Sequence, residues 1–151
     1  MKYSLLFILS FFAGALLAFQ NSISSQIGHL VKNPIFAAMV AFLISLILSL
    51  CYLGFSKNGF PQKEELFSIP KHLYLLSGTM SFLALIVYFY AIPKIGISSV
   101  ITLGVSGQII FSIIASHFGL FSSPVERIST QKIIGTLLML SGVYLVNFNL
   151  N

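Results

Sequence analysis

The sequence predicts an all-α, polytopic membrane protein with five transmembrane helices, and three observations support this prediction. Hydrophobic residues make up 57% of the 151 residues and charged residues only 7%. The mean hydropathy is +0.99. A soluble domain carries about 25% charged residues, and a disordered chain has low hydrophobicity, so both classes are excluded. The third observation is that long uncharged intervals separate the charged residues.

These intervals define the expected helices. The five charge-free intervals are 3–31, 33–56, 72–93, 95–125 and 133–151. A helix needs roughly 20 residues to cross about 30 Å of hydrocarbon. The intervals lack the alternating pattern of barrel strands, and a helix pairs its own backbone groups within lipid. We therefore expect a single five-helix transmembrane domain, residues 1–151, with helices near 4–28, 34–56, 71–92, 97–118 and 130–149.

The first helix, 4–28, has a competing interpretation as a cleaved signal peptide. Lys2, the apolar stretch after it and Ala13-Gly-Ala15 resemble such a leader. Cleavage would leave four spans and no sizeable soluble domain to export, so we favour a membrane helix.

Two parts of this helix differ in character. Gly14 and Ala18 form a face of small residues for helix packing. Gln20 and Ser24 lie one turn apart, deep enough that neither is expected to reach the headgroups. We therefore expect Gln20 and Ser24 to line a cavity.

Helix 34–56 begins at a favourable boundary, because Asn33 is a good N-cap and Pro34 suits the first helical position. Its small residues share one narrow face, which allows another backbone to approach closely. The packing candidates on this face are Ala38, Ala41, Ser45 and Ser49. In the polar connection that follows, residues 61–67 could form a short interfacial helix, but we favour a solvated loop.

Helices 71–92 and 97–118 each carry a polar face that should point away from lipid, which offers a hydroxyl no partner. On the first, Ala84 accompanies the candidates Tyr74, Ser77, Ser81 and Tyr88. On the second, the polar half contains Ser98, Ser99, Thr102, Ser106, Gln108, Ser112 and Ser116. We expect a tight turn at Pro93–Gly96 and a helix end at Phe118-Gly119.

The last helix, 130–149, is expected to begin at a cap formed by Ser129 or Thr130. Gly135, Met139 and Gly142 share a face, which we interpret as a packing surface.

The proposed substrate pathway is Gln20, Ser24, Tyr74, Ser77, Ser81, Tyr88, Thr102, Ser106 and Gln108. The alternative for each hydroxyl is a purely structural role, because Ser and Thr in membrane helices commonly bond the carbonyl one turn back. Gln20 and Gln108 are stronger candidates, since a buried amide cannot be satisfied so locally.

Several kinds of chemistry lack support. The three acids, Glu64, Glu65 and Glu126, all lie in loops, so no span holds a titratable carboxylate. No catalytic triad spacing or glycine-rich phosphate loop is present, so we expect no enzyme and no cofactor. The three histidines lie at span ends without ligand spacing, so no metal site is expected. The scattered cations form no basic face for nucleic acid.

The cations predict the orientation of the chain in its membrane. On the N-terminal side lie Lys2, Lys57, Lys63, Lys71, Arg127 and Lys132. Lys32 and Lys94 lie on the other side. Positive charge favours the cytoplasm, so we expect the N-terminus inside and the C-terminus outside.

Segments in all five predicted helices together resemble the drug/metabolite transporter superfamily, in particular its small single-repeat, YdcZ-like branch. They are Gly14–Gln20, Asn33–Ala38, Pro93–Gly96, Gly107-Gln108 with His117–Leu120, and Gly135–Gly142. The sequence departs from the family pattern at Ser24, Ala41 and Ser116, where the family tends to have Asn, Ser and an acidic residue. The departure at Ser116 weakens any proposal of ion coupling there.

This resemblance implies a protein of a bacterial inner membrane. It also implies a five-helix repeat, one half of a ten-helix transporter whose two halves are inserted in opposite orientations. An antiparallel homodimer would need both orientations, whereas the charge bias favours one. We therefore expect a heterodimer with an oppositely oriented paralogue, with an antiparallel homodimer as the alternative.

The function expected is alternating-access transport of a small organic metabolite or drug-like solute across the lipid bilayer. The uncharged lining suits a neutral or weakly cationic amphiphile. The competing hypothesis is a non-transporting accessory subunit of a larger membrane complex, whose polar stripes pack against partners.

Overall fold

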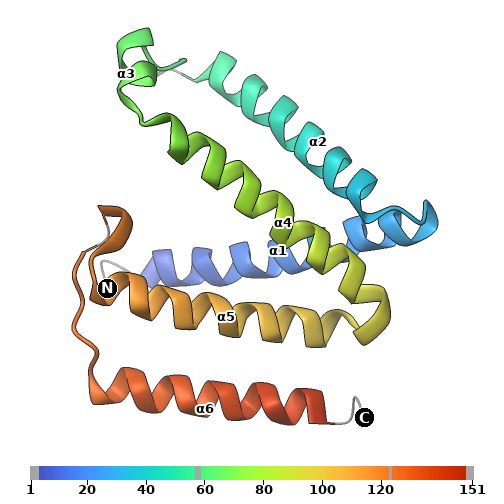
Figure 1. Ribbon diagram of the computed structural model, residues 1–151, viewed down its shortest axis with the longest axis vertical. Coiled ribbons are helices and arrows are strands. Elements are labelled where there is room, and N and C mark those ends of the chain that lie inside the picture. The colour runs from blue at the N-terminus through green and yellow to red at the C-terminus, as the bar shows by residue number, and fades with distance from the viewer. Residues whose placement is uncertain (1–3, 57–58, 123, 149–151) are drawn as a thin grey trace. The chain divides into compact units, whose positions relative to one another are not determined.

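The computed structural model describes residues 4–56, 59–122 and 124–148, and the chain forms two compact units, Met1–Pro93 and Lys94–Asn151. The first unit holds α1 (Ser4–Leu30), α2 (Pro34–Phe55), α3 (Lys63–Ser68) and most of α4 (Lys71–Ile95). The second holds α5 (Ile97–His117), the 3-10 turn η1 (Leu120–Ser122) and α6 (Thr130–Asn147). The described residues contain no strand, and Figure 1 labels the α-helices along the chain. Lys2, Lys57 and the predicted helix end at 149 lie outside the described residues.

The all-α polytopic membrane class is confirmed. Among the described residues, α1, α2, α4 and α5 are long and apolar enough to cross a membrane. The fifth predicted helix also forms, as α6, but it does not join this set. Its 18 residues would rise about 27 Å. They include Gln131, Lys132 and Asn147, which lower the mean hydropathy of this helix.

Two local predictions are wrong. Residues 63–68 are helical rather than a solvated loop, because the Glu65 carboxylate accepts the Gln62 N–H at 2.9 Å and caps the first turn. The four-residue turn expected at Pro93–Gly96 also does not form, since α4 continues through Pro93 to Ile95 and leaves Gly96 alone between the helices. The chain turns at Gly96, whose φ of +85° is readily adopted only by glycine.

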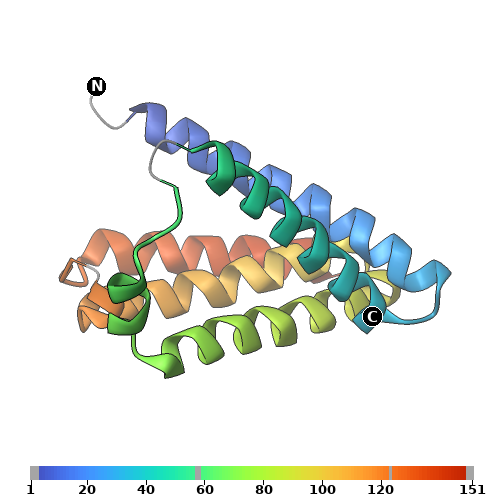
Figure 2. The same cartoon turned by 90° about the horizontal axis from the view of Figure 1, so that it is seen from above.

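The core of the first unit forms where α1 meets α2. Asn33 N–H bonds Gly28 O at 2.9 Å and Lys32 N–H bonds His29 O at 3.2 Å, with Lys32 in the left-handed region at φ 54°. These two bonds form a Schellman motif. Asn33 then caps α2 as predicted, because its side chain accepts the N–H groups of Ile35 and Phe36. The resulting three-residue turn brings the end of α1 against the start of α2, and the two helices diverge from there (Figures 1 and 2).

Small residues let this helix pair close. Gly28 lies against Pro34 and Ala37, such that a Cβ at Gly28 would be 3.2 Å from Pro34 Cα. Ala37 and Ala38 are fully buried and pack with Phe89 of α4. Away from this cluster, most large apolar side chains are exposed, as expected for lipid-facing helices, and so is the single thiol, Cys51 on α2.

In the second unit, α5 and α6 lie side by side (Figures 1 and 2). The helix end predicted at Phe118-Gly119 is confirmed, with Gly119 at φ +61°. Ser129 caps α6, because its hydroxyl accepts the Lys132 N–H at 3.3 Å. Near the other end of α6, Asn147 Nδ2 donates to Thr102 Oγ1 of α5 at 3.3 Å.

Candidate functional site

The polar segment of α1 is buried in the first unit. Asn21, Ser24 and Ser25 are 6%, 6% and 1% exposed. Gln20 and Ser24, the two residues expected to line a cavity, are hydrogen-bonded to each other, with Gln20 Nε2 donating to Ser24 Oγ at 3.0 Å. The Oδ1 atom of Asn21 is buried without a hydrogen-bond partner among the described residues. Asn21 and Ser25 were not predicted as site residues, although both lie in the polar run 20–26.

Ser25 is hydrogen-bonded to a carbonyl of α4 that a proline leaves without its helical donor. In a helix the N–H of residue 93 would bond the carbonyl of residue 89, but Pro93 has no N–H. The Phe89 carbonyl accepts instead from Ser25 Oγ, at 3.4 Å. Pro93 therefore provides α1 with an acceptor on α4, and this link belongs to the packing of the first unit.

The predicted pathway residues of α4 have different surroundings. Tyr74 is exposed, and its hydroxyl donates to Leu66 O of α3 at 3.2 Å. Ser77 is exposed and bonds Tyr74 O. Ser81 is exposed, whereas Tyr88 is half-buried against Ala37, Ala38 and Phe89. The structure does not bring these four residues together.

The predicted pathway residues of α5 also differ from one another in burial and in hydrogen bonding. Ser106 is buried and donates to Thr102 O at 2.7 Å. Thr102 is half-buried; its hydroxyl donates to Ser98 O at 2.8 Å and accepts from Asn147. Gln108 is exposed. The local hydroxyl-to-carbonyl bonding expected as the structural alternative is thus present at Ser77, Thr102 and Ser106.

The predicted packing residues divide by location. Ala38 is buried, and Ala18 and Ala41 are half-buried. The remaining members are exposed, namely Gly14, Ser45, Ser49, Gly135 and Gly142. A Cβ added at Gly14, Gly135 or Gly142 would meet nothing within 4 Å. Within this chain, close packing therefore occurs near the α1–α2 turn and not along the other predicted faces.

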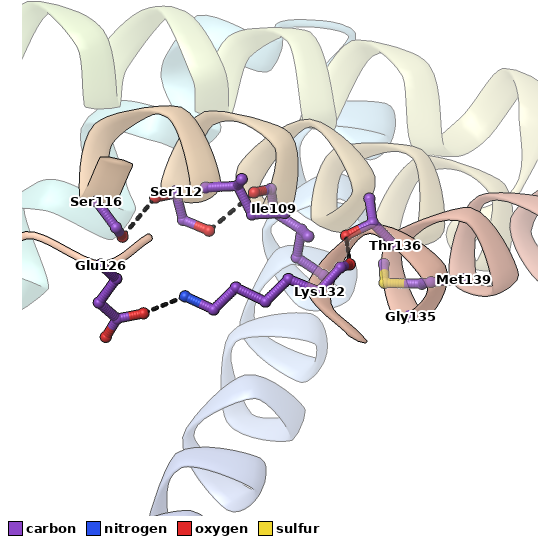
Figure 3. A pocket seen from close by; sticks show the side chains of 9 residues that line it. Ile109, Ser112, Ser116, Glu126, Lys132, Gly135, Thr136 and Met139 are labelled. Atoms are coloured by element: carbon purple, nitrogen blue, oxygen red, sulfur yellow. Dashed lines mark hydrogen bonds and ion pairs between the residues drawn. The ribbon is translucent and has the colours of Figure 1, made fainter. Parts of the chain in front are cut away.

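Between α5 and α6 lies an open groove with a polar end. This polar end is a cavity of about 360 Å³. Its lining comprises Ile109, Ser112, Ile113, Ser116, Glu126, Lys132, Gly135, Thr136 and Met139. Figure 3 shows the Lys132 side chain extended toward Glu126, with which it forms an ion pair.

A hydrogen bond at the end of α5 and the start of α6 together position this ion pair. The carbonyl of Ser116 lies in the last turn of α5 and lacks a helical donor of the usual kind. It accepts the backbone N–H of Glu126 at 3.0 Å, which holds the connecting segment at the end of α5. Lys132 lies in the first turn of α6. The charged groups thus meet at one mouth of the groove, where both side chains remain partly exposed.

The hydroxyls of the polar end all donate to their own helices. Ser112 donates to Ile109 O at 2.8 Å, Ser116 to Ser112 O at 2.6 Å and Thr136 to Lys132 O at 2.7 Å (Figure 3). A hydroxyl that has committed its proton keeps two lone pairs as acceptors. Apart from the Lys132 ammonium, the side chains of the polar end therefore offer acceptors and apolar surface.

A second cavity continues the groove toward the other end of the two helices. It has a volume of about 440 Å³ and shares Met139 with the polar end. Its remaining lining residues are Ile101, Thr102, Val105, Gly142, Val143 and Val146. This apolar end carries one hydroxyl, at Thr102. The α5–α6 groove therefore has charge and hydroxyls at one end and aliphatic side chains at the other.

Sequence reasoning identified the facing sides of α5 and α6 but missed the charges. Ser112 and Ser116 fall on the predicted polar half, and Gly135, Met139 and Gly142 on the predicted face of the last helix. Glu126 was treated only as an acid in a loop, and Lys132 only as a cation that sets orientation. Their opposite signs across the Ser129 cap were the signal that could have paired them.

Among the described residues, no group of three or more His, Cys, Asp or Glu side chains is arranged to hold a metal ion. A protein-family model described as "Putative inner membrane exporter, YdcZ" matches residues 5–145. No curated protein and no solved structure matches the chain.

Proposed function

Because the chain belongs to the YdcZ family, whose model is described as a putative inner membrane exporter, we propose that it moves a small organic metabolite or drug-like solute by alternating access, as a half-transporter acting in a dimer. It is a multi-pass inner membrane protein, and this membership favours a transporter over an enzyme. The observation that carries the proposal is the extent of the family match, which covers all or nearly all of each described α-helix.

Polar side chains on the spanning helices support a solute route. Lipid offers them no hydrogen bonds, so side chains such as Gln108 and Ser81, exposed in the single chain, need protein, water or solute beside them. We keep the predicted pathway set as the proposed lining and add the α5–α6 groove. The groove would receive the solute from one side of the membrane.

The sparse packing of the chain supports the half-transporter. In the most apolar window of each spanning helix, only 6–17% of the residues are buried. Gly14 and Gly142 have open space where a side chain would be. Small exposed residues let membrane helices approach closely, so these faces suit a second protein.

The proposed partner is an oppositely oriented paralogue. In the predicted topology, one side of the membrane carries Lys63, Lys71, Arg127 and Lys132. The other side carries Lys32 and Lys94. This bias should hold most copies with the N-terminus inside and the C-terminus outside. A pair of opposite halves then needs a second protein with reversed bias, and an antiparallel homodimer is the alternative.

Transport by purified protein in liposomes tests the proposal. The protein, alone or with a similarly sized partner of reversed loop charge, is assayed for flux of labelled small organic solutes. Gln108→Leu keeps the bulk and removes the amide, so we expect flux to fall about tenfold with membrane abundance unchanged. Gln131→Leu, the same change at an exposed position of α6 outside the proposed route, is the matched control.

Three outcomes of this assay would contradict parts of the proposal. No flux under any partner condition would favour the accessory subunit. Flux by this chain alone would exclude an obligate heteromer, and unchanged flux in the Gln108→Leu protein would remove that residue from the route.

A further inference from the structure

We infer that the α5–α6 groove binds an amphiphile with an ammonium head group. The ammonium of this ligand displaces the Lys132 ammonium and is held by the Glu126 carboxylate. The inference rests on the proposed function, because it assigns a chemical class to the solute that the protein would carry. It also identifies Glu126 as a binding residue, although Glu126 lies outside the membrane-spanning helices.

The first support comes from hydrogen-bond donors and acceptors. Ser112, Ser116 and Thr136 have their hydroxyl protons directed at backbone carbonyls 2.6–2.8 Å away. Their lone pairs and the Glu126 carboxylate are acceptors, so a head group that donates several hydrogen bonds suits the polar end. An ammonium donates and carries the charge that a carboxylate prefers. An anionic head group would find a single donor side chain, Lys132, among these acceptors.

The second support is that Lys132 can leave. The Lys132 and Glu126 side chains are 39% and 56% exposed, and an ion pair so accessible to water is weak. A lysine has a long flexible stem and can return its ammonium to water while the stem stays on apolar surface. Lys132 therefore acts as an internal placeholder for the ammonium of the ligand.

The third support is the shape of the groove. The polar end of about 360 Å³ and the apolar end of about 440 Å³ share Met139. Val105, Val143 and Val146 line the apolar end and offer an aliphatic wall to a tail. Cavities in this size range hold small organic ligands. A head at Glu126 with a tail along α5 and α6 would contact both ends.

Binding to the purified full-length protein in detergent tests the inference. The probes are 4-phenylbutylamine, 4-phenylbutanol and 4-phenylbutyrate, which share a tail and differ in the head group. Equilibrium dialysis should give an affinity for the amine about tenfold higher than for the alcohol or the acid. Equal affinity for the three probes would overturn the inference.

Variants at the two ends of the ion pair provide a sharper test. Glu126→Gln should weaken amine binding about tenfold, whereas Lys132→Met, which removes the competitor, should tighten it severalfold. A purely structural ion pair would give changes in the same direction, because both variants break it. Glu64→Gln and Lys63→Met on exposed α3 are the matched controls. Thermal unfolding of each variant checks that it is folded.

An ammonium could come from a free solute or from an amine-bearing phospholipid. In nanodiscs of phosphatidylcholine, added phosphatidylethanolamine should leave amine binding unchanged when the occupant is a free solute. Competition through Glu126 would identify the lipid head group as the occupant and would overturn the assignment of a solute.

Transport is measured separately, so the two proposals can fail independently. Changes of opposite sign in binding, without flux of any labelled solute in liposomes under any partner condition, would contradict the proposed function and support the site. Flux of other solutes without this pattern in binding would contradict the site and support the proposed function.

Discussion

The helix pairs α1–α2 and α5–α6 both have small residues on facing sides, but only α1–α2 packs tightly at such residues, next to its connecting turn. At α1–α2, Gly28 touches Pro34 and Ala37, and Ala38 is fully buried. At α5–α6, Gly135 and Gly142 line an open groove, and a Cβ at either would meet nothing. A face of small residues therefore permits contact but does not produce it.

The connections between the helices account for the difference. A three-residue turn with a Schellman motif and an Asn33 cap leads directly from α1 into α2. Between α5 and α6 the chain runs from Phe118 to Ser129 and is held at the Ser116 carbonyl by Glu126. A short connection brings backbones together from the first turn, whereas the longer one leaves space that charged and polar side chains line.

Introducing leucine at one glycine of each helix pair should produce the largest difference in stability between the two pairs. Gly28→Leu must push against backbone atoms of Pro34, and overpacking of this kind costs about 1–3 kcal/mol. Gly135→Leu enters open space, and leucine favours helix over glycine, so stability should not fall. Thermal unfolding in detergent measures both. Equal destabilisation would mean that the α5–α6 groove is closed in the protein.

A double-mutant cycle tests how α1 is joined to α4. Ser25→Ala removes a hydroxyl that bonds Phe89 O, and we expect a loss of about 0.5–1 kcal/mol. Pro93→Ala restores the N–H that can bond the same carbonyl, so Ser25→Ala should cost almost nothing in that background. Denaturant unfolding of the four proteins gives the coupling energy. Strict additivity would show that the proline does not create the acceptor.

The helix caps should give the smallest difference. Asn33 accepts two N–H groups at 3.0 and 3.1 Å, and Ser129 accepts one at 3.3 Å. Asn33→Ala should cost about 1 kcal/mol and Ser129→Ala less. The order of the unfolding midpoints checks this prediction, and a greater loss at Ser129 would contradict it.

Much of the fold could be predicted because the charges mark the helix ends. The intervals between Lys2, Lys32 and Lys57 enclose α1 and α2, and α4 begins at Lys71 and ends one residue beyond Lys94. The helix starts at Asn33-Pro34 and Ser129 follow from capping chemistry. Residues 63–68 were missed because their cap depends on one Gln62–Glu65 bond. The passage of α4 through Pro93 was missed because the acceptor that a proline frees is satisfied from a distant helix.

Less of the candidate site could be predicted, since helical periodicity identifies faces but not what lies opposite them. The spacing of Gln20 and Ser24 placed them one turn apart on one helix face, but their mutual hydrogen bond was not predicted. The link from Asn147 to Thr102 joins residues 45 positions apart, and the burial of Asn21 depends on neighbours that spacing along one helix does not reveal. The Glu126–Lys132 ion pair could not be predicted without knowing how the connecting segment bonds to the end of α5.

The exposed thiol on α2 has a practical consequence for deciding the assembly. The chain contains one cysteine, Cys51, so a spin label attached there marks a single position per copy without further mutagenesis. Two labelled copies in one particle would produce a single dipolar distance. A particle that pairs this chain with an unlabelled paralogue would produce none.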